Sequence, residues 1–267
     1  MILSTENLTL NVKVIGDMSK SLPLIFFHGF LGSGESWNEI VPHINNPIIL
    51  IDLPGHAKSH FKDIDNFSFT DWNNDFKSIL DQLHIDQINL CGYSMGGRLA
   101  LSFACEYPQR VKKLILESSA PGIRDKVEQS NRVEKDLLDI LEMKKDYSGF
   151  VRKWATHRLF ENQKDRNLRG WKAQRKIRLQ QNESQVSLSL QFLGNGKMPQ
   201  LWEKIKKLQS SVMLITGSED SKYCRIATEC FQEIPDCKWV NISNCSHNVH
   251  LEQSAQFIES IKTFLQS

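Results

Sequence analysis

The chain has 267 residues, of which 40% are hydrophobic, and a formal net charge of +2 at pH 7. This length allows one large core, or one core with an inserted subdomain. The near-neutral charge argues against nucleic acid as a partner. No apolar run approaches the roughly 18 residues of a membrane span, which argues against a membrane protein.

The first residues and the cysteines bear on location. Met-Ile-Leu-Ser-Thr-Glu-Asn has neither the basic nor the apolar segment of a secretion signal. The six cysteines form no Cys-x-x-Cys pair; they stand at positions 91, 105, 224, 230, 237 and 245. Both features favour reduced thiols in a cytoplasmic protein. A zinc site made from the four later cysteines is a weaker alternative, because their spacing fits no zinc pattern.

Short apolar runs recur along the chain, and each suits a strand that is buried on both faces. One or two edge strands are predicted between Glu6 and Gly16. The buried runs that follow are 24–27, 48–51, 88–91, 111–116, 212–215 and 239–242.

Helical patterns separate several of these runs. From Trp72 to Leu83, apolar residues at i, i+4, i+7, i+8 and i+11 form one face of a helix, with Thr70 or Asp71 as its N-cap. Residues 257–265 predict the last helix in the same way. Strands that alternate with helices predict an α/β fold with a mostly parallel central sheet and helices on both faces.

The alternation stops from about residue 122 to residue 208, where charged helical stretches replace the strand runs. We therefore expect a helical lid at 122–208, inserted into a core made of 1–121 and 209–267. Residues 122–207 carry 20 Lys and Arg against 11 Asp and Glu, which indicates either solvated helix faces or a basic surface over a site for an acidic ligand. One amphipathic helix of the lid is indicated by Val133, Leu137, Leu138, Ile140 and Leu141.

The pentapeptide Gly92-Tyr93-Ser94-Met95-Gly96 lies between the apolar run 88–91 and a helical stretch. Strand, Gly-x-Ser-x-Gly and helix in this order are typical of a nucleophile elbow, a sharp turn that exposes the serine hydroxyl. Glycines suit the turn because a Cβ would clash there. The helix that follows directs its N-terminal amides at Ser94. Alone, so short a pattern also arises by chance.

A serine becomes reactive only when a histidine takes its proton. His247 follows the run 239–242, and Asp220 follows the run 212–215 and supplies the acid that holds the histidine tautomer. Ser94, Asp220 and His247 come in the chain order Ser, Asp, His, each beyond the carboxyl end of a predicted parallel strand. We predict that they form a catalytic triad, although His247 taken alone would be an ordinary surface-loop histidine.

The segment His28-Gly29-Phe30 follows the run 24–27. The backbone N–H groups of Phe30 and Met95 are expected to converge near the serine and form an oxyanion hole. His28 itself is expected to be structural and hydrogen-bonded beneath the site. The turn at 52–56 is expected to be scaffold, and His250 is expected to pack or hydrogen-bond locally.

These motifs resemble the α/β-hydrolase superfamily over nearly the whole chain. Within it, the elbow extended to Gly97-Arg98 resembles that of the 2-succinyl-6-hydroxy-2,4-cyclohexadiene-1-carboxylate synthases of menaquinone biosynthesis. Ser246 departs from that family, in which glycine is commoner at this position. Shorter likenesses are 119–123, the Arg-x-x-x-Asp pattern at 132–136, 154–160, 178–182 and the histidine loop 246–252.

The resemblance implies a lyase that eliminates pyruvate from 2-succinyl-5-enolpyruvyl-6-hydroxy-3-cyclohexene-1-carboxylate, without a metal or organic cofactor. Ser94, deprotonated by His247 with Asp220 behind it, would take the ring proton. The oxyanion hole would stabilise the negative charge that reaches the succinyl ketone oxygen.

The substrate implied by this resemblance carries three carboxylates, and arginine binds carboxylates bidentately. Arg98 follows the elbow, and Arg132 and Arg178 lie in the predicted lid, although a surface salt bridge explains each arginine taken alone as well. Tyr93 is expected to line the pocket and Trp154 to pack the lid against the substrate ring. We expect a small-molecule polycarboxylate as partner, neither nucleic acid nor membrane, and a monomer or homodimer.

Two other functions fit parts of this pattern. A serine hydrolase acting on esters, thioesters or carbon–carbon bonds shares the triad and the oxyanion hole, but a neutral ester has no use for three converging arginines. A non-catalytic binding protein on the same fold has no need of an intact triad. An aspartate nucleophile is excluded by the serine at position 94.

Overall fold

The computed structural model describes residues 1–160 and 162–267. Within them, strands form one sheet in the order β1-β2-β4-β3-β6-β7-β8-β9, and β5 pairs with β2. The strands from β4 to β9 along this order are parallel, whereas β2 pairs antiparallel with its neighbours. The predicted α/β fold with a mostly parallel sheet is confirmed. The strands are β1 (Ile2–Ser4), β2 (Leu8–Ile15), β3 (Leu24–Phe27), β4 (Ile48–Ile51), β5 (His60–Phe61), β6 (Ile88–Tyr93), β7 (Val111–Glu117), β8 (Ser211–Gly217) and β9 (Cys237–Ile242).

The parallel strands lie where the apolar runs predicted them, and β3 and β4 are buried at every position. Four strands are longer than their runs, because backbone pairing with the neighbouring strand continues where the side chains turn polar. Strand β6 continues to Tyr93 and β7 to Glu117, so both reach the edge of the sheet from which Ser94 projects.

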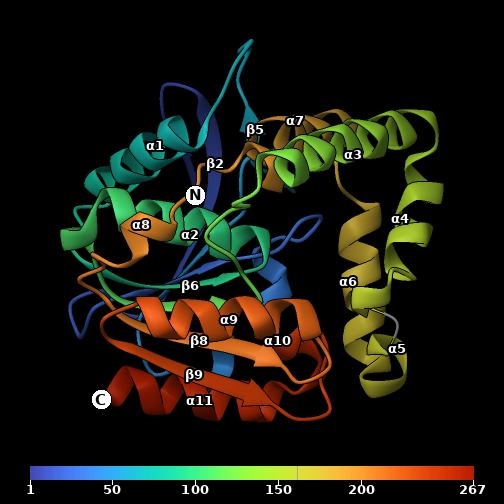
Figure 1. Cartoon of the computed structure of the whole chain (residues 1–267). Helices are drawn as coiled ribbons and strands as arrows, with labels where there is room; N and C mark the ends of the chain where they lie inside the picture. Colours follow the sequence, from blue (N-terminus) through green and yellow to red (C-terminus); the bar gives the residue numbers. More distant parts are fainter. Residues whose placement is uncertain (161) are drawn as a thin grey trace.

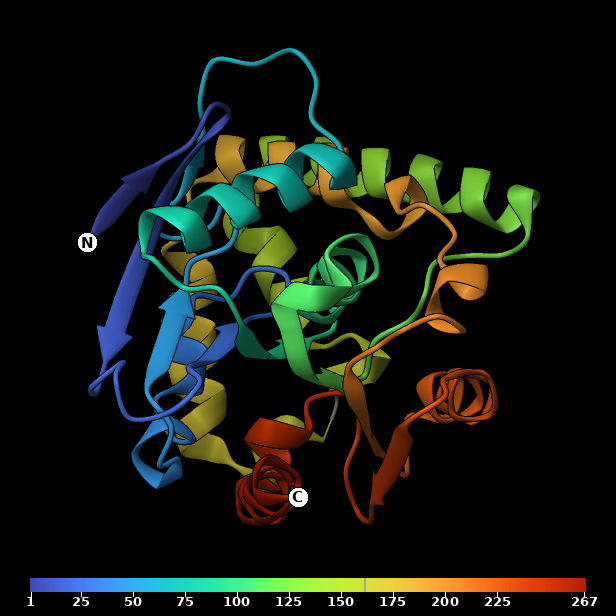
Figure 2. The ribbon, with the colours of Figure 1, turned by 90° about the vertical axis from the view of Figure 1, so that its left-hand side faces the viewer.

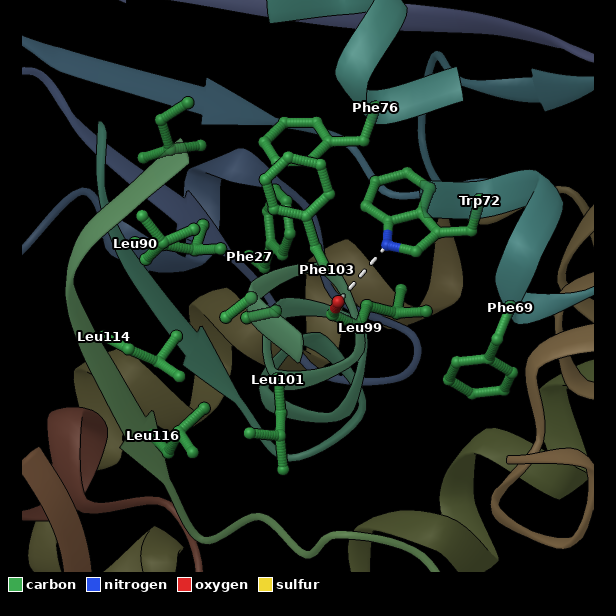
Figure 3. Packing of buried hydrophobic residues seen from close by; sticks show 14 of the residues in the cluster. Phe27, Phe69, Trp72, Phe76, Leu90, Leu99, Leu101, Phe103, Leu114 and Leu116 are labelled. Atoms are coloured by element: carbon green, nitrogen blue, oxygen red, sulfur yellow. Dashed lines mark hydrogen bonds between the residues drawn. The ribbon is translucent and has the colours of Figure 1, made fainter. Parts of the chain in front are cut away.

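Helices cover both faces of the sheet (Figure 2). Helices α1 (Phe69–Gln82), α2 (Met95–Glu106) and α9 (Ser221–Glu233) contribute side chains to the larger hydrophobic cluster on one face. Helix α11 (Ser254–Gln266) packs against the other face. In the larger cluster the Phe76 ring lies 4.9 Å from that of Phe27 and 4.5 Å from that of Phe103, both edge-on (Figure 3). Edge-to-face aromatic pairs of this kind join the helices to the sheet beneath the serine turn.

Helix α1 begins at Phe69, two or three residues earlier than predicted, and neither predicted N-cap is correct. The N-cap is Ser68, whose hydroxyl accepts a hydrogen bond from the backbone N–H of Asp71. In return, the Asp71 carboxylate accepts from the backbone N–H of Ser68 at 2.9 Å. Asp71 therefore occupies the third helical position of a capping box, and Thr70 caps nothing.

A run of helices occupies the segment between β7 and β8. Figure 1 shows α4, α5 and α6 on the side toward which β8 and β9 point, with α3 and α7 crossing above them. The carboxyl ends of the parallel strands therefore face these helices, which is where open α/β sheets place their sites. The helices are α3 (Lys126–Lys145), α4 (Tyr147–Ala155), α5 (Gln163–Arg166), α6 (Leu168–Leu179), α7 (Glu183–Leu193) and α8 (Trp202–Ile205), joined in places by short 3-10 turns.

The predicted amphipathic helix in this segment exists as α3, but its buried face differs from the expected one. Ile140 is 6% exposed, whereas Leu137, Leu138 and Leu141 are at least half exposed. The helices α3, α4 and α7 share a small hydrophobic cluster that also takes in Leu31 of the core. Because these helices touch the body of the protein along one edge, fewer apolar positions are covered than the pattern predicts.

Candidate active site

Ser94 lies alone between the end of β6 and the start of α2, with φ 51° and ψ −107°. A Cβ on Gly92 or Gly96 would lie within 3.0 Å of backbone atoms, those of Gly96 and of Phe27 respectively. Glycine at both positions therefore permits the turn. The backbone N–H of Ser94 donates to the carbonyl oxygen of Glu117 at 2.9 Å, which ties the turn to β7.

Ser94, His247 and Asp220 meet at the carboxyl edge of the sheet. The Nε2 of His247 lies 3.0 Å from the Oγ of Ser94, and its Nδ1 lies 2.6 Å from Oδ2 of Asp220. Side chains of His247 and Asp220 are each 2% exposed. With Nδ1–H donating to the carboxylate, Nε2 is left as the acceptor for the serine proton, which is the geometry that a general base needs.

Neighbouring structure fixes both partners of the serine. Asp220 is the N-cap of α9, and its Oδ1 accepts from the backbone N–H of Tyr223 at 3.3 Å. The Tyr223 ring lies 4.7 Å from the His247 ring, and the Phe160 ring lies 6.0 Å from it. The imidazole is thus held between aromatic side chains from the core and from the segment above it.

The two predicted oxyanion donors lie on either side of this turn: Phe30 follows β3, and Met95 is the first residue of α2. Among the described residues, neither backbone N–H makes a hydrogen bond within the protein. The N–H of Met95 belongs to the first turn of a helix, where amides have no intrahelical partner and the helix dipole is positive. Both groups are therefore free to donate to an oxygen bound beside Ser94.

His28 lies beneath the site, as expected of a structural residue. Its Nδ1 donates to the carbonyl oxygen of Gly29 at 2.8 Å, and its Nε2 accepts from the backbone N–H of Leu53 at 2.9 Å. His56 is used in the same way, donating to Pro54 and accepting from the N–H of Leu31. Burial lowers the pKa of His28 to about 4 and that of His56 to about 3, so both are neutral.

A small cavity of about 30 Å³ opens beside the Ser94 hydroxyl. That volume has room for about one or two water molecules. A larger cavity, about 510 Å³, lies beside strand β2 and does not include Ser94. The small cavity is lined by Gly29, Phe30, Gly32, Ser36, Tyr93, Ser94, Trp154, Phe160, Gln174, Arg178, Asn248 and His250.

Three of the predicted binding residues line this cavity: Tyr93, Trp154 and Arg178. Arg178 on α6 is only 4% exposed, and its guanidinium lies 5.1 Å from the centre of the Phe160 ring. Within the described residues, no carboxylate forms an ion pair with it. Burial lowers its pKa, yet arginine stays protonated at neutral pH. The cavity thus has a cationic wall.

The other two arginines lie outside the lining of this cavity. Arg132 is paired with Asp136, one turn further along α3, at 2.8 Å. Burial lowers the pKa of Arg98, on α2, to about 10. Tyr223 and Arg132 are close enough to contribute to this shift. The Nε of Arg98 is buried without a hydrogen-bond partner in the described part of the chain. The structure therefore places one arginine at the cavity and the other two together beside Tyr223.

Sequence reasoning missed the partner of His250. The expected local hydrogen bond is wrong: Nδ1 of His250 lies 2.7 Å from Oε2 of Glu117, 133 residues away in the chain. Its backbone N–H donates to the other carboxylate oxygen of Glu117 at 3.0 Å. The signal in the sequence was a single glutamate directly after the apolar run 111–116, at the carboxyl end of a buried strand.

A polar network joins the histidine loop to the helices above. Ser246, where the resembling family more often has glycine, donates from its hydroxyl to the carboxylate of Glu252 and to the carbonyl oxygen of Leu159. Arg166 on α5 pairs with Glu252 at 2.6 Å and with Glu219. Because Glu219 precedes Asp220 and Ser246 precedes His247, this network contacts both loops that carry the triad.

No helix within 1–160 or 162–267 combines the length and the apolar character that crossing a bilayer requires. The same residues hold no cluster of three or more His, Cys, Asp and Glu side chains arranged for a metal ion. The six cysteines are free thiols.

The profile of the alpha/beta hydrolase fold family matches residues 23–254. The chain is 34% identical to the "Putative 2-succinyl-6-hydroxy-2,4-cyclohexadiene-1-carboxylate synthase" of Bacillus subtilis (strain 168), over 91% of this chain and 90% of that protein. It is 25% identical to the 2-succinyl-6-hydroxy-2,4-cyclohexadiene-1-carboxylate synthase of Pectobacterium atrosepticum, over 91% of this chain and 93% of that one.

A solved structure, that of MenH from S. aureus, superposes with a TM-score of 0.90 at 30% identity and covers 96% of this chain and 97% of its own. Sequence and structure agree over nearly the full length of both chains, so the likeness extends to the helical segment above the site. The chain therefore belongs to the alpha/beta hydrolase fold family and, within it, to the family of the 2-succinyl-6-hydroxy-2,4-cyclohexadiene-1-carboxylate synthases.

Proposed function

We propose that this protein is a carbon–oxygen lyase of menaquinone biosynthesis. It eliminates pyruvate from 2-succinyl-5-enolpyruvyl-6-hydroxy-3-cyclohexene-1-carboxylate and yields 2-succinyl-6-hydroxy-2,4-cyclohexadiene-1-carboxylate. The relatives that match over nine tenths of the chain carry the name of this activity. The observation that carries the proposal in this chain is the 3.0 Å approach of His247 to Ser94, beside a cavity walled by Arg178.

In the proposed reaction, Ser94 is the base. His247 accepts the hydroxyl proton of Ser94 as the serine oxygen takes a proton from the ring, and Asp220 stabilises the resulting imidazolium. The electron pair of the broken C2–H bond moves onto the adjacent succinyl ketone oxygen, and it later returns through the ring double bond to C5. At the ketone oxygen the N–H groups of Phe30 and Met95 donate to charge that exists only in the transition state.

The second step breaks the bond between the ring carbon and the leaving oxygen. The electrons return into the ring as the bond between the ring carbon and the enolpyruvyl oxygen breaks, and the proton held by His247 passes to the leaving oxygen. Pyruvate departs as its enol, and Ser94 keeps the proton that it took from the ring. An acyl-enzyme has no place in this sequence, because no ester or amide bond is cleaved.

Donor side chains would hold the substrate carboxylates. Burial and the nearby Glu117 carboxylate raise the pKa of Tyr93, so the phenol stays protonated and donates. Arg178 supplies a planar cation in the same cavity. The Trp154 ring, 5.5 Å from that of Phe30, would cover the substrate ring. We assign the remaining carboxylates to Arg98 and Arg132, which requires Arg132 to exchange Asp136 for substrate.

The proposal extends to the organisation of the chain. We propose that residues 122–208 act as the lid of a core made of 1–121 and 209–267, because the cavity beneath these helices is too small for the substrate. We propose a cytoplasmic enzyme, supported by its six free thiols, that needs no cofactor. The serine, the histidine and the donors named above supply every proton transfer that the elimination requires.

Ser94→Ala tests this function. The variant should release pyruvate from the enolpyruvyl substrate at least about 100-fold more slowly than the wild type, because positioned acid–base catalysis is worth roughly 10² to 10⁴ in rate. A lactate dehydrogenase-coupled assay follows the pyruvate. A p-nitrophenyl ester is the control substrate, and mass spectrometry of the reacting enzyme searches for an adduct on Ser94.

Two results would contradict the proposal. Rapid cleavage of the ester with no release of pyruvate by the wild type would make the protein a serine hydrolase. A covalent intermediate trapped on Ser94 with the natural substrate would remove the base role from the serine.

A further inference from the structure

Glu117 and His250 form a second carboxylate–histidine pair beside the triad. Glu117 is fully buried and His250 is 2% exposed. The pair repeats the arrangement of Asp220 and His247, since in each case Nδ1 of the ring faces the carboxylate. The mechanism proposed above makes no use of it.

The two ring nitrogens of His250 differ in their partners. Nδ1 is bound to Glu117, whereas Nε2 is buried and has no hydrogen-bond partner among the described residues. His28 and His56, the other buried histidines outside the triad, have both nitrogens bound to backbone groups. Buried polar atoms in proteins are nearly always paired, so a free nitrogen points to a partner that binds there.

Aromatic rings enclose the imidazole of His250. The Trp37 ring lies 4.2 Å from it and is tilted by 31°, and the Tyr93 ring lies 5.0 Å from it, edge-on. Rings at these distances would stabilise a proton that the imidazole gains when an anion binds beside it.

His250 lines the same cavity as Ser94, Tyr93 and Arg178. Nδ1 and Nε2 diverge across the ring, so with Nδ1 on Glu117 the Nε2 atom is directed away from that carboxylate. Tyr93 and Arg178 also present hydrogen-bond donors that no described protein group accepts. The side chains of Tyr93 on β6, Arg178 on α6 and His250 in the histidine loop therefore line the same cavity.

We propose that His250 is a substrate-binding residue: it gains a proton as a carboxylate enters the cavity, and its Nε2–H then joins the Arg178 guanidinium and the Tyr93 hydroxyl in a subsite for one substrate carboxylate. This assignment rests on the proposed function, which requires a polycarboxylate. Glu117 is then a positioning residue: it fixes the ring of His250 through its carboxylate and the turn at Ser94 through its carbonyl oxygen.

A pair of substitutions separates the subsite from a purely structural role. In His250→Asn the side-chain amide replaces Nδ1 and keeps a donor for Glu117, but nothing replaces Nε2. In His250→Gln the amide nitrogen reaches the position of Nε2. We expect KM for the enolpyruvyl substrate to rise at least about tenfold in His250→Asn, with part of the rise recovered in His250→Gln. The exposed His43 supplies the matched control, His43→Asn, with unchanged kinetics.

Labelling of Ser94 by a neutral fluorophosphonate tests the subsite without relying on the lyase reaction. The labelling rate depends on Ser94, His247 and the oxyanion donors, so the rate of each protein without succinate serves as its own reference. Succinate should slow labelling of the wild type and protect His250→Asn far less. Equal protection of both proteins, or none of the wild type, would overturn the subsite even if pyruvate release is observed.

Nitrogen NMR of the wild type, labelled with ¹⁵N-histidine, tests the protonation of the His250 ring. The only variant that it requires is the one that assigns the His250 signals. We expect the Nε2 signal of His250 to shift when succinate is added, and Nε2 to carry a proton in the succinate complex. A bare Nε2 in the succinate complex would overturn the proposal. Absence of pyruvate release with a protonated, succinate-responsive His250 would instead reject the lyase function and leave the carboxylate subsite in place.

Discussion

Ser94 holds a backbone conformation that few non-glycine residues adopt, with a positive φ of 51°. Conformations of this kind cost roughly 1–3 kcal/mol and persist only where the surroundings impose them. Here the backbone N–H of Ser94 donates to the carbonyl oxygen of Glu117, and the carbonyl oxygen of Ser94 accepts from the backbone N–H of Arg98. Gly92 and Gly96 leave room for this turn. The strain directs the hydroxyl out of the sheet toward His247.

Arg178 is the residue whose role in binding is most open to a direct test. In Arg178→Ala the cavity loses its cationic wall, so KM for the enolpyruvyl substrate should rise at least about tenfold and kcat should fall as well, because a carboxylate held loosely also misplaces the ring proton. Steady-state pyruvate release measures both constants.

The control for this substitution lies on the same helix. Arg175 is exposed and contacts only the Trp171 ring, so Arg175→Ala removes the same charge from α6 without touching the cavity. Equal kinetic effects in the two variants would show that the positive charge of the lid acts from a distance and that Arg178 has no place at the cavity.

For single residues, sequence reasoning succeeded where a short motif determines the local backbone geometry. The elbow, Asp220 and His247 were identified because each follows a predicted strand, and parallel strands end at a common edge. The same reasoning grouped Arg98, Arg132 and Arg178 as one set. The structure divides them, because Asp136 pairs with Arg132 and the position of a helix-borne side chain depends on how its helix packs.

At the scale of elements, α5 is one of the points where the helical segment is anchored to the core. Arg166 joins the side chains of Glu219 and Glu252, and the Glu252 side chain is fully buried. Asn167 adds a hydrogen bond to the carbonyl oxygen of Leu251 at 2.9 Å. These contacts reach the loops that hold Asp220 and His247, so the position of α5 and the alignment of the triad are coupled.

Arg166→Ala should therefore lower the free energy of unfolding by about 2 kcal/mol, the range of a hydrogen bond to a charged group in a partly buried site. It should also reduce kcat/KM severalfold, because Glu219 and Ser246 each adjoin a triad residue. Urea unfolding and pyruvate release measure the two effects. Arg169→Ala, an exposed arginine on α6, should change stability by less than about 0.5 kcal/mol; an equal loss in both variants would contradict the anchoring role.

Individual helices were predicted better than their boundaries and faces. The period of the apolar residues from Trp72 to Leu83 identified α1, but its N-cap is Ser68, because Asp71 serves the capping box from inside the helix. The spacing of the leucines in α3 predicted a buried face, but these leucines are exposed. A period of 3.6 residues shows which side chains share a face, and it does not show whether another element covers that face.

The whole molecule is organised by a sheet with two differently covered faces. Side chains that alternate along β3 separate into two clusters: Ile25 and Phe27 pack toward α1 and α2, and Leu24 and Phe26 pack toward α11. The described sequence from 198 to 208 joins the first of these clusters through Met198 and Trp202. The helical segment therefore returns into the main core before β8 begins.

Stability of the whole molecule should depend on pH through His28 and His56. Their folded-state pKa values, about 4 and about 3, are below the ordinary value of 6.5. As pH falls below 6.5, the unfolded chain binds protons that the folded protein excludes, so stability is complete above that pH and decreases below it. By pH 4, His28 alone should account for about 3 kcal/mol, at roughly 1.4 kcal/mol per unit of pKa.

Urea unfolding between pH 7.5 and pH 4.5 measures this dependence. The free energy of unfolding should fall steadily from pH 6.5 downward, and His43→Asn, which removes an exposed histidine, should leave the slope unchanged. A free energy that stays constant from pH 7 to pH 5 would contradict the neutral, desolvated state of the two buried rings.

The sequence by itself determined the class of fold, the serine turn and the order of the three residues around it. These follow from local rules: apolar runs form buried strands, glycines permit a sharp turn, and polar residues that follow parallel strands meet at one edge. Only the tertiary structure decided that Glu117 faces His250, that Arg166 joins α5 to both triad loops, and that Arg178 alone of the three arginines lines the cavity. Each of these depends on contacts between segments that lie far apart in the chain, whose meeting is set by how helices and sheet pack and by no local pattern.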